Sequence, residues 1–276
     1  FLLYQSFMTP HTAANPARFT LDNFIEAYSG EENLALLFNS LQFAFGTAVL
    51  ALVIGTLLAV AAGAYGAVHQ YRWSDRALTL FSFVTLSIPV VVLAVLFKNA
   101  GIELNNLLGF TGEAKLLYTT GEITPGLDPW SWDGIVNRLA HLVLPSLVLI
   151  VGSIAFYSRY QRSAMLDVLG SDFLRTARAK GVSSWRAVWR HALPCAAVPV
   201  ANMIGLQTVL LLSGAVLTET VFDWPGLGKY IVDALLVNDY VVVQAGGIVV
   251  ATLFIAVNFA LDLSFLWLEP RLRHGS

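Results

Sequence analysis

Five basic side chains gather in the segment 172–199, where they can bind an anionic group or an acidic surface: Arg175, Arg178, Lys180, Arg186 and Arg190. The hydrophobic runs before this segment (139–158) and from its end onward (191–218) contain no Asp, Glu, Lys or Arg. Charge confined between uncharged runs predicts a docking segment on which a partner acts. The partner, rather than this chain, then supplies the work.

Motifs for chemistry within the chain itself are missing from the sequence. Residues 225–230, PGLGKY, only imitate a phosphate-binding loop, because the spacing differs and Tyr230 replaces Ser or Thr. There is no HExxH, no GxSxG and no Cys/His ligand spacing, and the single cysteine, Cys195, permits no internal disulfide. We therefore expect no enzyme, no metal site and no cofactor in this chain.

Composition indicates an integral membrane protein with an all-α fold. Hydrophobic residues make up 57% of the chain and charged residues 12%, whereas a soluble domain has about 25% charged residues. Five uncharged runs are each long enough to cross the hydrocarbon core as a helix: 33–71, 77–97, 139–158, 191–218 and 240–261. Pro89, Pro145 and Pro199 lie within these runs and predict kinks.

Basic residues concentrate on one side of this predicted bundle. Alternating the loops places 11 of the 16 Lys and Arg residues together, namely Arg72, Arg76, Arg159, Arg162, Arg175, Arg178, Lys180, Arg186, Arg190, Arg271 and Arg273. Lys and Arg mark cytoplasmic loops, so we expect a cytoplasmic C-terminus and a cytoplasmic loop at 159–194. The segments 98–138 and 219–241 then face outward.

The first 38 residues fit this pattern least well. By parity the residues near position 30 lie outside, and FLLYQSFM at residues 1–8 resembles the outer end of a hydrophobic helix. We expect a truncated first span followed by an outward segment, with a short interfacial segment as the alternative. Residues 39–273 then form the transmembrane domain.

The residue pattern of the docking segment predicts two helices joined by a glycine turn. Ser171 or Asp172 can cap the first helix with its side-chain oxygen, and Gly181 can end it in a left-handed conformation. Ser183 or Ser184 can cap a second helix, which Pro194 is expected to interrupt. The alternative role, lying on anionic lipid headgroups, requires a continuous apolar face, which the small residues of the first helix do not provide.

Gly181, followed by His191, Leu193 and Pro194, resembles the cytoplasmic signature of ATP-binding-cassette importer permeases. Arg175-Thr176-Ala177 stands where that signature has Glu-Ala-Ala, and His191 replaces Ile, a departure similar to the dipeptide and oligopeptide branch. The resemblance implies that the first helix is a coupling helix seated in a groove of an ATPase subunit. Carried over residue by residue, this helix comprises Asp172, Phe173, Leu174, Arg175, Thr176, Ala177, Arg178, Ala179, Lys180 and Gly181.

A second segment is similar to the outer loop of the B-type permease subunit in that branch. It contains Glu219, Asp223, Trp224, Pro225, Gly226 and Gly228. The resemblance implies that these residues contact an external binding protein. The alternative is a re-entrant structural cap without a partner.

The resemblance implies a type I importer permease in the bacterial inner membrane that forms the path for di- or oligopeptides. Its partners would be a homologous C-type permease, two cytoplasmic ATPase subunits carrying ATP and Mg, an extracytoplasmic binding protein and membrane lipid, with no nucleic acid. Importers of nickel or metal chelates share these motifs and remain open as an alternative. The uncharged spans disfavour an ATP-independent coupled carrier, and the docking segment disfavours a simple channel. A non-transporting membrane scaffold would tolerate mutation of the kinking prolines and of the docking segment.

Overall fold

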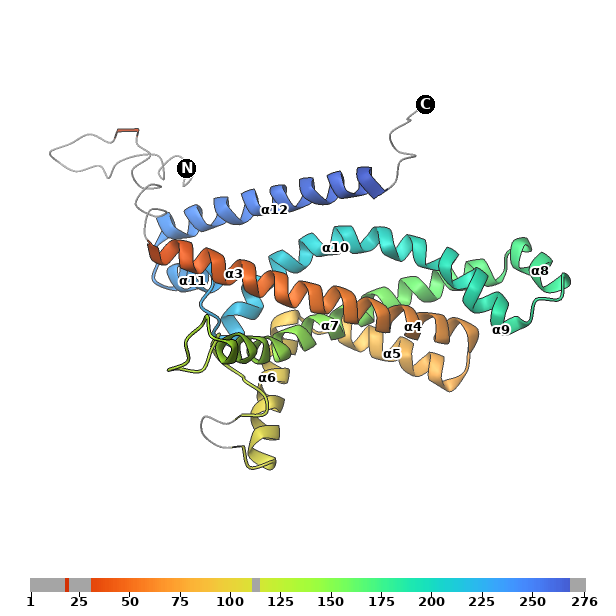
Figure 1. Ribbon diagram of the computed structural model, residues 1–276, viewed down its shortest axis with the longest axis horizontal. Coiled ribbons are helices and arrows are strands. Elements are labelled where there is room, and N and C mark those ends of the chain that lie inside the picture. Colours follow the sequence, from red (N-terminus) through yellow and green to blue (C-terminus); the bar gives the residue numbers. More distant parts are fainter. Residues whose placement is uncertain (1–17, 20–30, 111–114, 269–276) are drawn as a thin grey trace. The chain divides into compact units, whose positions relative to one another are not determined.

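The computed structural model describes residues 18–19, 31–110 and 115–268, and its regular elements are all helices (Figure 1). For parts of α3 (Glu31–Leu50), α10 (Leu193–Phe222) and α12 (Tyr240–Leu268), only the backbone is described. The predicted all-α fold is confirmed. The proposed remnant of a first span, residues 1–8, lies outside the described residues and stays a prediction.

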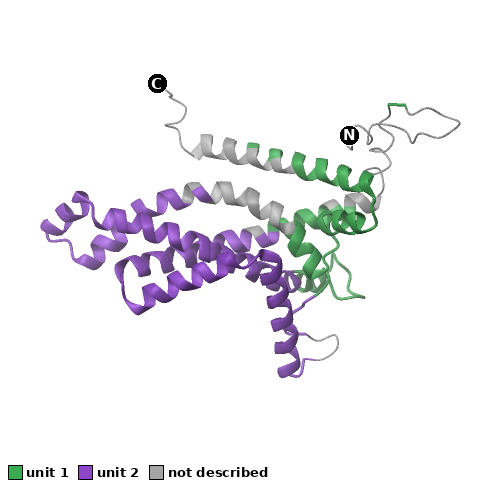
Figure 2. Cartoon of the chain, turned by 180° about the vertical axis from the view of Figure 1, so that it is seen from behind, with its two compact units in different colours: residues 1–45, 120–138, 211–276 green, residues 46–119, 139–210 purple. Residues whose placement is uncertain are grey.

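The chain divides into two compact units, which Figure 2 shows in different colours. Unit 1 comprises residues 1–45, 120–138 and 211–276, and unit 2 comprises residues 46–119 and 139–210. The predicted docking segment therefore belongs to unit 2. The loop around residues 219–228 belongs to unit 1.

The first long helix continues from α3 through a π-helical segment, η1 (Ala51–Gly55), into α4 (Thr56–Val68). Its stretch Phe38–Val68 is apolar and long enough to cross a membrane. Within unit 2, α4 packs closely on α7 (Trp132–Leu169), because a Cβ atom on Gly63 would lie only 2.5 Å from the Ser158 carbonyl oxygen. Small residues permit this close approach of membrane helices.

The prediction of a single span over 77–97 is wrong, because the helix that begins this run ends before Pro89 and a second helix starts after it. α5 (Trp73–Ser87) ends before Ile88, which is extended with φ −88° and ψ 124°, and α6 (Val90–Leu107) follows Pro89. The proline ring disfavours helical geometry at the preceding residue. α6, rather than the whole run, therefore has the length and hydropathy of a span.

Helix α7, with 38 residues, is another helix apolar enough to span, and it includes Pro145 without ending there. It continues to Leu169, well past the uncharged run that predicted it. Its basic residues Arg159 and Arg162 are thus helical. The extension carries the helix directly to the docking segment.

The prediction that Pro194 interrupts the second hairpin helix is also wrong. α9 (Ser184–Ala187), the π-helical segment η2 (Val188–Ala192) and α10 follow one another without a break. Proline removes one backbone donor from the ladder, and the wider π turn immediately before Pro194 changes the hydrogen-bond register there. Pro199 likewise lies inside α10.

The C-terminal part of unit 1 consists of α11 (Leu227–Leu236) packed against α12. α10 has 30 residues and α12 has 29, so both have the length of a membrane span. Asn202, Gln207 and Ser213 lie on α10 at positions whose side chains fall outside the described part. A role in lining the path or in bridging helices remains open for them.

Candidate functional site: a docking hairpin and a buried turn

Residues 172–192, here called the docking hairpin, contain α8 (Asp172–Ala179) and the α9–η2 helix. Gly181 has φ +86°, and its N–H donates to the Arg178 carbonyl at 3.0 Å. No atom outside its neighbours lies within 4 Å of a Cβ built on Gly181, so the backbone conformation alone requires glycine there. The predicted helix, glycine turn and helix are confirmed.

The predicted serines stand at the helix starts, but the predicted hydrogen bonds from their side chains to the helix amides are absent. Ser171 and Ser183 do occupy the N-cap positions of α8 and α9, but neither makes a side-chain cap bond. The Ser171 hydroxyl instead donates to the Val168 carbonyl at 2.6 Å. The Ser171 hydroxyl therefore pairs with a backbone carbonyl in the last turn of α7. It makes no hydrogen bond to the first backbone amides of α8.

Most of the predicted coupling residues are exposed on the surface of unit 2. Asp172, Phe173, Arg175, Thr176, Arg178, Ala179, Lys180 and Gly181 are exposed, Ala177 is half-buried, and Leu174 is fully buried. Thr176 Oγ1 donates to the Asp172 carbonyl at 2.8 Å. The exposed Arg175 and Asp172 side chains lie 3.6 Å apart, which at such exposure contributes little to stability.

Leu174 anchors α8 to the rest of unit 2. It belongs to a buried cluster with Ala67 of α4, Met165 of α7, and Ala187, Val188, Ala192 and Ala196 of the following helices. This set is called the anchor cluster below. Because the other members of the cluster come from three long helices, Leu174 joins α8 to all three of them.

The signature residues lie beside this anchor. His191 packs its ring against Phe173 in an edge-on arrangement, with centroids 6.1 Å apart. Leu193 is half-buried and Pro194 is exposed. Phe173 and His191 thus join the two helices of the docking hairpin.

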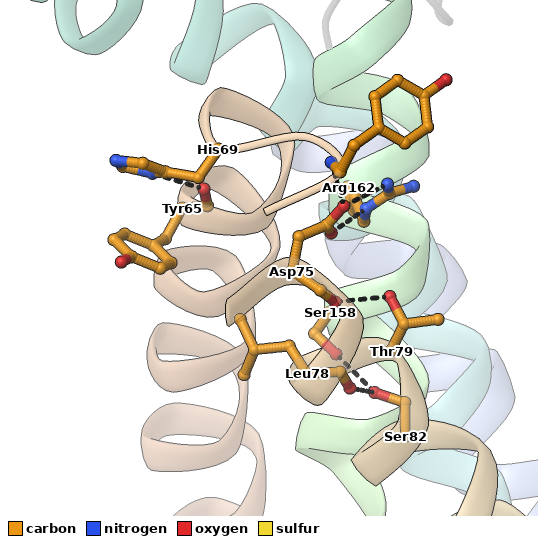
Figure 3. Close-up of polar contacts among 9 residues, drawn as sticks. Tyr65, His69, Asp75, Leu78, Thr79, Ser82, Ser158 and Arg162 are labelled. Carbon is orange, nitrogen blue, oxygen red and sulfur yellow. Dashed lines mark hydrogen bonds and ion pairs between the residues drawn. The ribbon is translucent and has the colours of Figure 1, made fainter. Parts of the chain in front are cut away.

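An ion pair that sequence reasoning missed lies next to the docking hairpin in unit 2. Arg162 of α7 donates through Nε and Nη2 to the two carboxylate oxygens of Asp75, at 2.6 and 2.8 Å (Figure 3). The Asp75 side chain is 4% exposed and the Arg162 side chain 29%. The fork geometry of arginine suits two parallel bonds to one carboxylate. The one signal of this pair in the sequence is Asp75 itself, an acidic residue that stands between Arg72 and Arg76.

The same carboxylate shapes the turn between α4 and α5. The Tyr71 amide donates to Asp75 Oδ2 at 3.0 Å, and Tyr71 has φ +65°, a conformation that costs a non-glycine residue roughly 1–2 kcal/mol. Hydrogen bonds from Arg162 lower the pKa of Asp75, against the opposing effect of its burial. Asp75 therefore stays charged and holds the α4–α5 turn against α7.

Residues 219–228, which run from the last turn of α10 into the start of α11, form a buried turn closed by Glu219. This carboxylate is 2% exposed and accepts from the Gly228 amide at 2.8 Å. Trp224, 1% exposed, packs on Phe43 of α3 with ring centroids 4.9 Å apart, and its indole N–H donates to the Asn39 carbonyl at 3.2 Å. We call residues 219–228 the Glu219 turn.

The six predicted binding-protein contacts are thus divided by burial. Glu219, Trp224, Gly226 and Gly228 are buried within unit 1, Pro225 is half-buried and Asp223 is exposed. Asp223, with φ +56°, forms an ion pair with Lys229 at 3.4 Å, and Lys229 also forms an ion pair with Asp233 at 2.8 Å. The pKa of Lys229 is raised by Asp233 first and Asp223 second. The buried residues shape the turn, and its exposed edge carries these charges.

Gly228→Ala is expected to destabilise the Glu219 turn. The new Cβ would lie 2.6 Å from Glu219 Oε2 and 2.6 Å from Val216 Cα, and such overpacking costs about 1–3 kcal/mol. The measurement is thermal unfolding of the purified protein in detergent. Gly247→Ala in α12 is the control, since no atom lies within 4 Å of its Cβ. An equal melting temperature for Gly228→Ala and Gly247→Ala contradicts the close contact.

Comparison with known families identifies the architecture that contains these two sites. Residues 51–274 match the family described as binding-protein-dependent transport system inner membrane component. The chain belongs to this family. The match includes both the docking hairpin and the Glu219 turn, and the predicted resemblance to importer permeases is confirmed.

Named relatives in this inner membrane component family include peptide permeases. The chain is 39% identical over 225 residues to the oligopeptide transport system permease protein OppB of Mycobacterium tuberculosis, covering 82% of this chain and 68% of that protein. It is 36% identical over 234 residues to the dipeptide transport system permease protein DppB of Escherichia coli, covering 82% and 69%.

Solved structures share the fold of this family at lower sequence identity. The MetNI methionine ABC transporter in an inward-facing conformation matches with a TM-score of 0.62 and 17% identity, over 87% of this chain and 99% of that chain. A bacterial ABC transporter involved in import of the acidic polysaccharide alginate matches with a TM-score of 0.57 and 18% identity, over 90% and 83%. The predicted type I importer fold is confirmed.

Proposed function

We propose that this chain is a permease subunit of a binding-protein-dependent importer and forms part of the path for di- or oligopeptides. The support is the identity to OppB and DppB, whose names state oligopeptide and dipeptide transport. The observation that carries the coupling role is the exposed helix α8, held to three long helices by the buried Leu174. An exposed helix joined in this way suits transfer of motion from a partner.

The proposal includes an orientation and a set of partners. The basic side carrying the docking hairpin and the C-terminus faces the cytoplasm, and the Glu219 turn faces outward. Two ATPase subunits that bind ATP and Mg engage residues 172–181. A second, C-type permease completes the path, and an external binding protein delivers the peptide to the outer side.

In this mechanism, closure of the ATPase subunits moves α8. The buried cluster that Leu174 shares with Met165 and Ala67 passes the motion to α7 and α4, while the Asp75–Arg162 pair keeps α4, α5 and α7 moving together. The side chains exposed on α8 provide the surface to which an ATPase groove binds. Transport of the peptide then follows from rearrangement of the spans.

Gly181→Pro is expected to abolish peptide uptake without preventing membrane insertion. Proline fixes φ near −65°, whereas this position requires φ +86°. Gly181→Asn is the control, because asparagine tolerates the left-handed conformation and the space around Gly181 is open. The measurement is uptake of labelled di- and tripeptides by cells, with the amount of chain in the membrane fraction determined in parallel.

Two results would overturn parts of the proposal, and a second variant provides an independent check. Normal uptake with Gly181→Pro would contradict the coupling role of the docking hairpin. A bulky replacement at the half-buried Ala177, such as Ala177→Phe, should also abolish uptake and serves as an independent check. Uptake of nickel but not of peptides by the wild-type complex would replace the proposed substrate with the alternative one.

A further inference from the structure

An apolar groove of about 610 Å³ lies in unit 2 between the end of α4 and the α9–η2 helix. Figure 1 shows the α4–α5 turn and the docking hairpin at the same end of this unit. The residues that form its sides include Ala61, Ala64 and Val68 of α4 and Trp185, Val188 and Trp189 of the hairpin. A groove of this size lies within the range of small-molecule sites, roughly 300–1,000 Å³.

Two tryptophans and two arginines alternate along this edge of the docking hairpin. Trp185 is 72% exposed and Trp189 42%, and their rings lie 5.0 Å apart. Arg186 and Arg190 follow them directly and are exposed. Within the part of the chain that the structure describes, neither arginine makes an ion pair. Neither arginine lines the groove, but each follows in sequence a tryptophan that does.

Aromatic rings also close the α4 side of the groove. The Tyr65 and His69 rings lie with centroids 4.3 Å apart and planes tilted by 31°, and Figure 3 shows both rings pointing away from the Asp75–Arg162 pair. Both residues contribute to the lining. His69 Nδ1 lies 3.0 Å from the Tyr65 carbonyl oxygen, an interaction that fixes the ring at the end of α4.

The groove lies at one end of an apolar helix that is longer than a membrane crossing. Phe38–Val68 is 31 residues long and ends at the groove, whereas about 20 residues cross the hydrocarbon core. The last turns of α4 can therefore extend into the headgroup region. Tryptophan and tyrosine concentrate at this depth, where one part of the ring is apolar and another is hydrated.

We propose that this groove binds an acyl chain of an anionic phospholipid whose phosphate is bound by Arg186 and Arg190. The apolar lining suits hydrocarbon, and each arginine follows a lining tryptophan on the same helix, from which its long side chain can reach a headgroup at the rim. Basic residues near a membrane surface attract anionic lipid. The site rests on the proposed cytoplasmic orientation, because the cytoplasmic leaflet carries the negative surface potential.

Lipid in this groove would also contact the coupling machinery. Val188 lines the groove and belongs to the anchor cluster that holds Leu174. An acyl chain on Val188 thus covers the face of the cluster that is open to the groove. The lipid thereby supports the position of the docking hairpin at the membrane surface.

The test uses the assembled permease complex in nanodiscs of phosphatidylcholine with increasing phosphatidylglycerol. One of the two lipids carries bromine on its acyl chains, which quenches nearby tryptophan fluorescence. The signal of Trp185 and Trp189 is the difference between the wild-type complex and the double variant Trp185→Phe, Trp189→Phe. We expect brominated phosphatidylglycerol to quench this signal at a severalfold lower mole fraction than brominated phosphatidylcholine.

Removing the two arginines should weaken this preference. In the variant Arg186→Gln, Arg190→Gln we expect the half-quenching fraction of phosphatidylglycerol to rise about fivefold for each arginine removed. The matched control, Arg72→Gln with Arg76→Gln, removes the same charge from exposed positions outside both the docking hairpin and the lining of the groove. The control should leave the fraction close to that of the wild type.

Two results overturn the proposal. Equal quenching by the two lipids, or an equal effect of the Arg72 and Arg76 changes, would show a general membrane contact without a binding site. Absence of quenching, together with cross-linking of Trp185 to the second permease, would make the groove a protein interface. Peptide uptake is measured separately, so a complex that imports peptides but shows no lipid preference rejects this site alone.

Discussion

Leu174→Ala is expected to reduce peptide uptake at least tenfold while the chain still inserts into the membrane. Leu174 is the buried residue of α8 and is 0% exposed, and a buried Leu→Ala change costs about 2–5 kcal/mol. An eight-residue helix has little stability of its own. Loss of this anchor therefore loosens the docking hairpin, while the packing of α4 on α7 at Gly63 is left intact.

The decisive measurement is the ratio of peptide imported to ATP hydrolysed by the reconstituted complex. A loosened hairpin is expected to lower this ratio, whereas a simple loss of folded protein lowers both quantities together. Leu107→Ala is a matched control, since Leu107 is 82% exposed at the end of α6. An unchanged ratio in Leu174→Ala would contradict transfer of motion through the anchor cluster.

The sequence predicted the docking hairpin well because its signals are local. Gly181 is required by a single backbone conformation, φ +86°, and the serines at 171 and 183 stand at helix starts. The hydrogen bond of the Ser171 hydroxyl was not predictable in the same way. Its partner, the Val168 carbonyl, became available only because α7 continues to Leu169.

Proline positions were predicted less well, because a proline's effect depends on the residues around it. Pro89 divides a run that hydropathy alone treats as one span, whereas Pro194 remains inside a continuous helix. The difference lies in the π turn over Val188–Ala192, which no residue pattern in the run indicated. A count of uncharged residues gives the number of apolar runs but not where a helix breaks.

Residues of the Glu219 turn were identified as a group, but their burial was not predictable from their order. Trp224 packs on Phe43 and bonds to Asn39, residues about 180 positions earlier in the chain. Contacts over such a separation leave no periodic signal in the sequence. The prediction of a binding-protein surface therefore now concerns the exposed edge at Asp223 rather than the buried Glu219 and Trp224.

Arg162→Met is expected to be the most destabilising single change at the Asp75–Arg162 pair. It keeps an apolar stem near Gly66 and Asp75 but leaves a carboxylate that is 4% exposed without its main partner, and breaking a buried pair in this way costs about 3–5 kcal/mol. Asp75→Asn should cost less, because the Arg162 side chain is 29% exposed and can regain water. The free energy of unfolding in detergent measures both changes.

The double variant Asp75→Asn, Arg162→Met separates a pairwise interaction from simple loss of packing. If the cost of Arg162→Met comes from the stranded carboxylate, the double variant is more stable than Arg162→Met alone. Lys229→Met is the control, because its partner Asp233 is 52% exposed and such pairs contribute about 0–1 kcal/mol.

Acid should act in the same direction as Asp75→Asn: the pKa of Asp75 is lowered, so its contribution to stability is present at neutral pH and is lost as the pH falls through that lowered value. Additive costs in the double variant, with no such loss in acid, would show that the two side chains contribute independently.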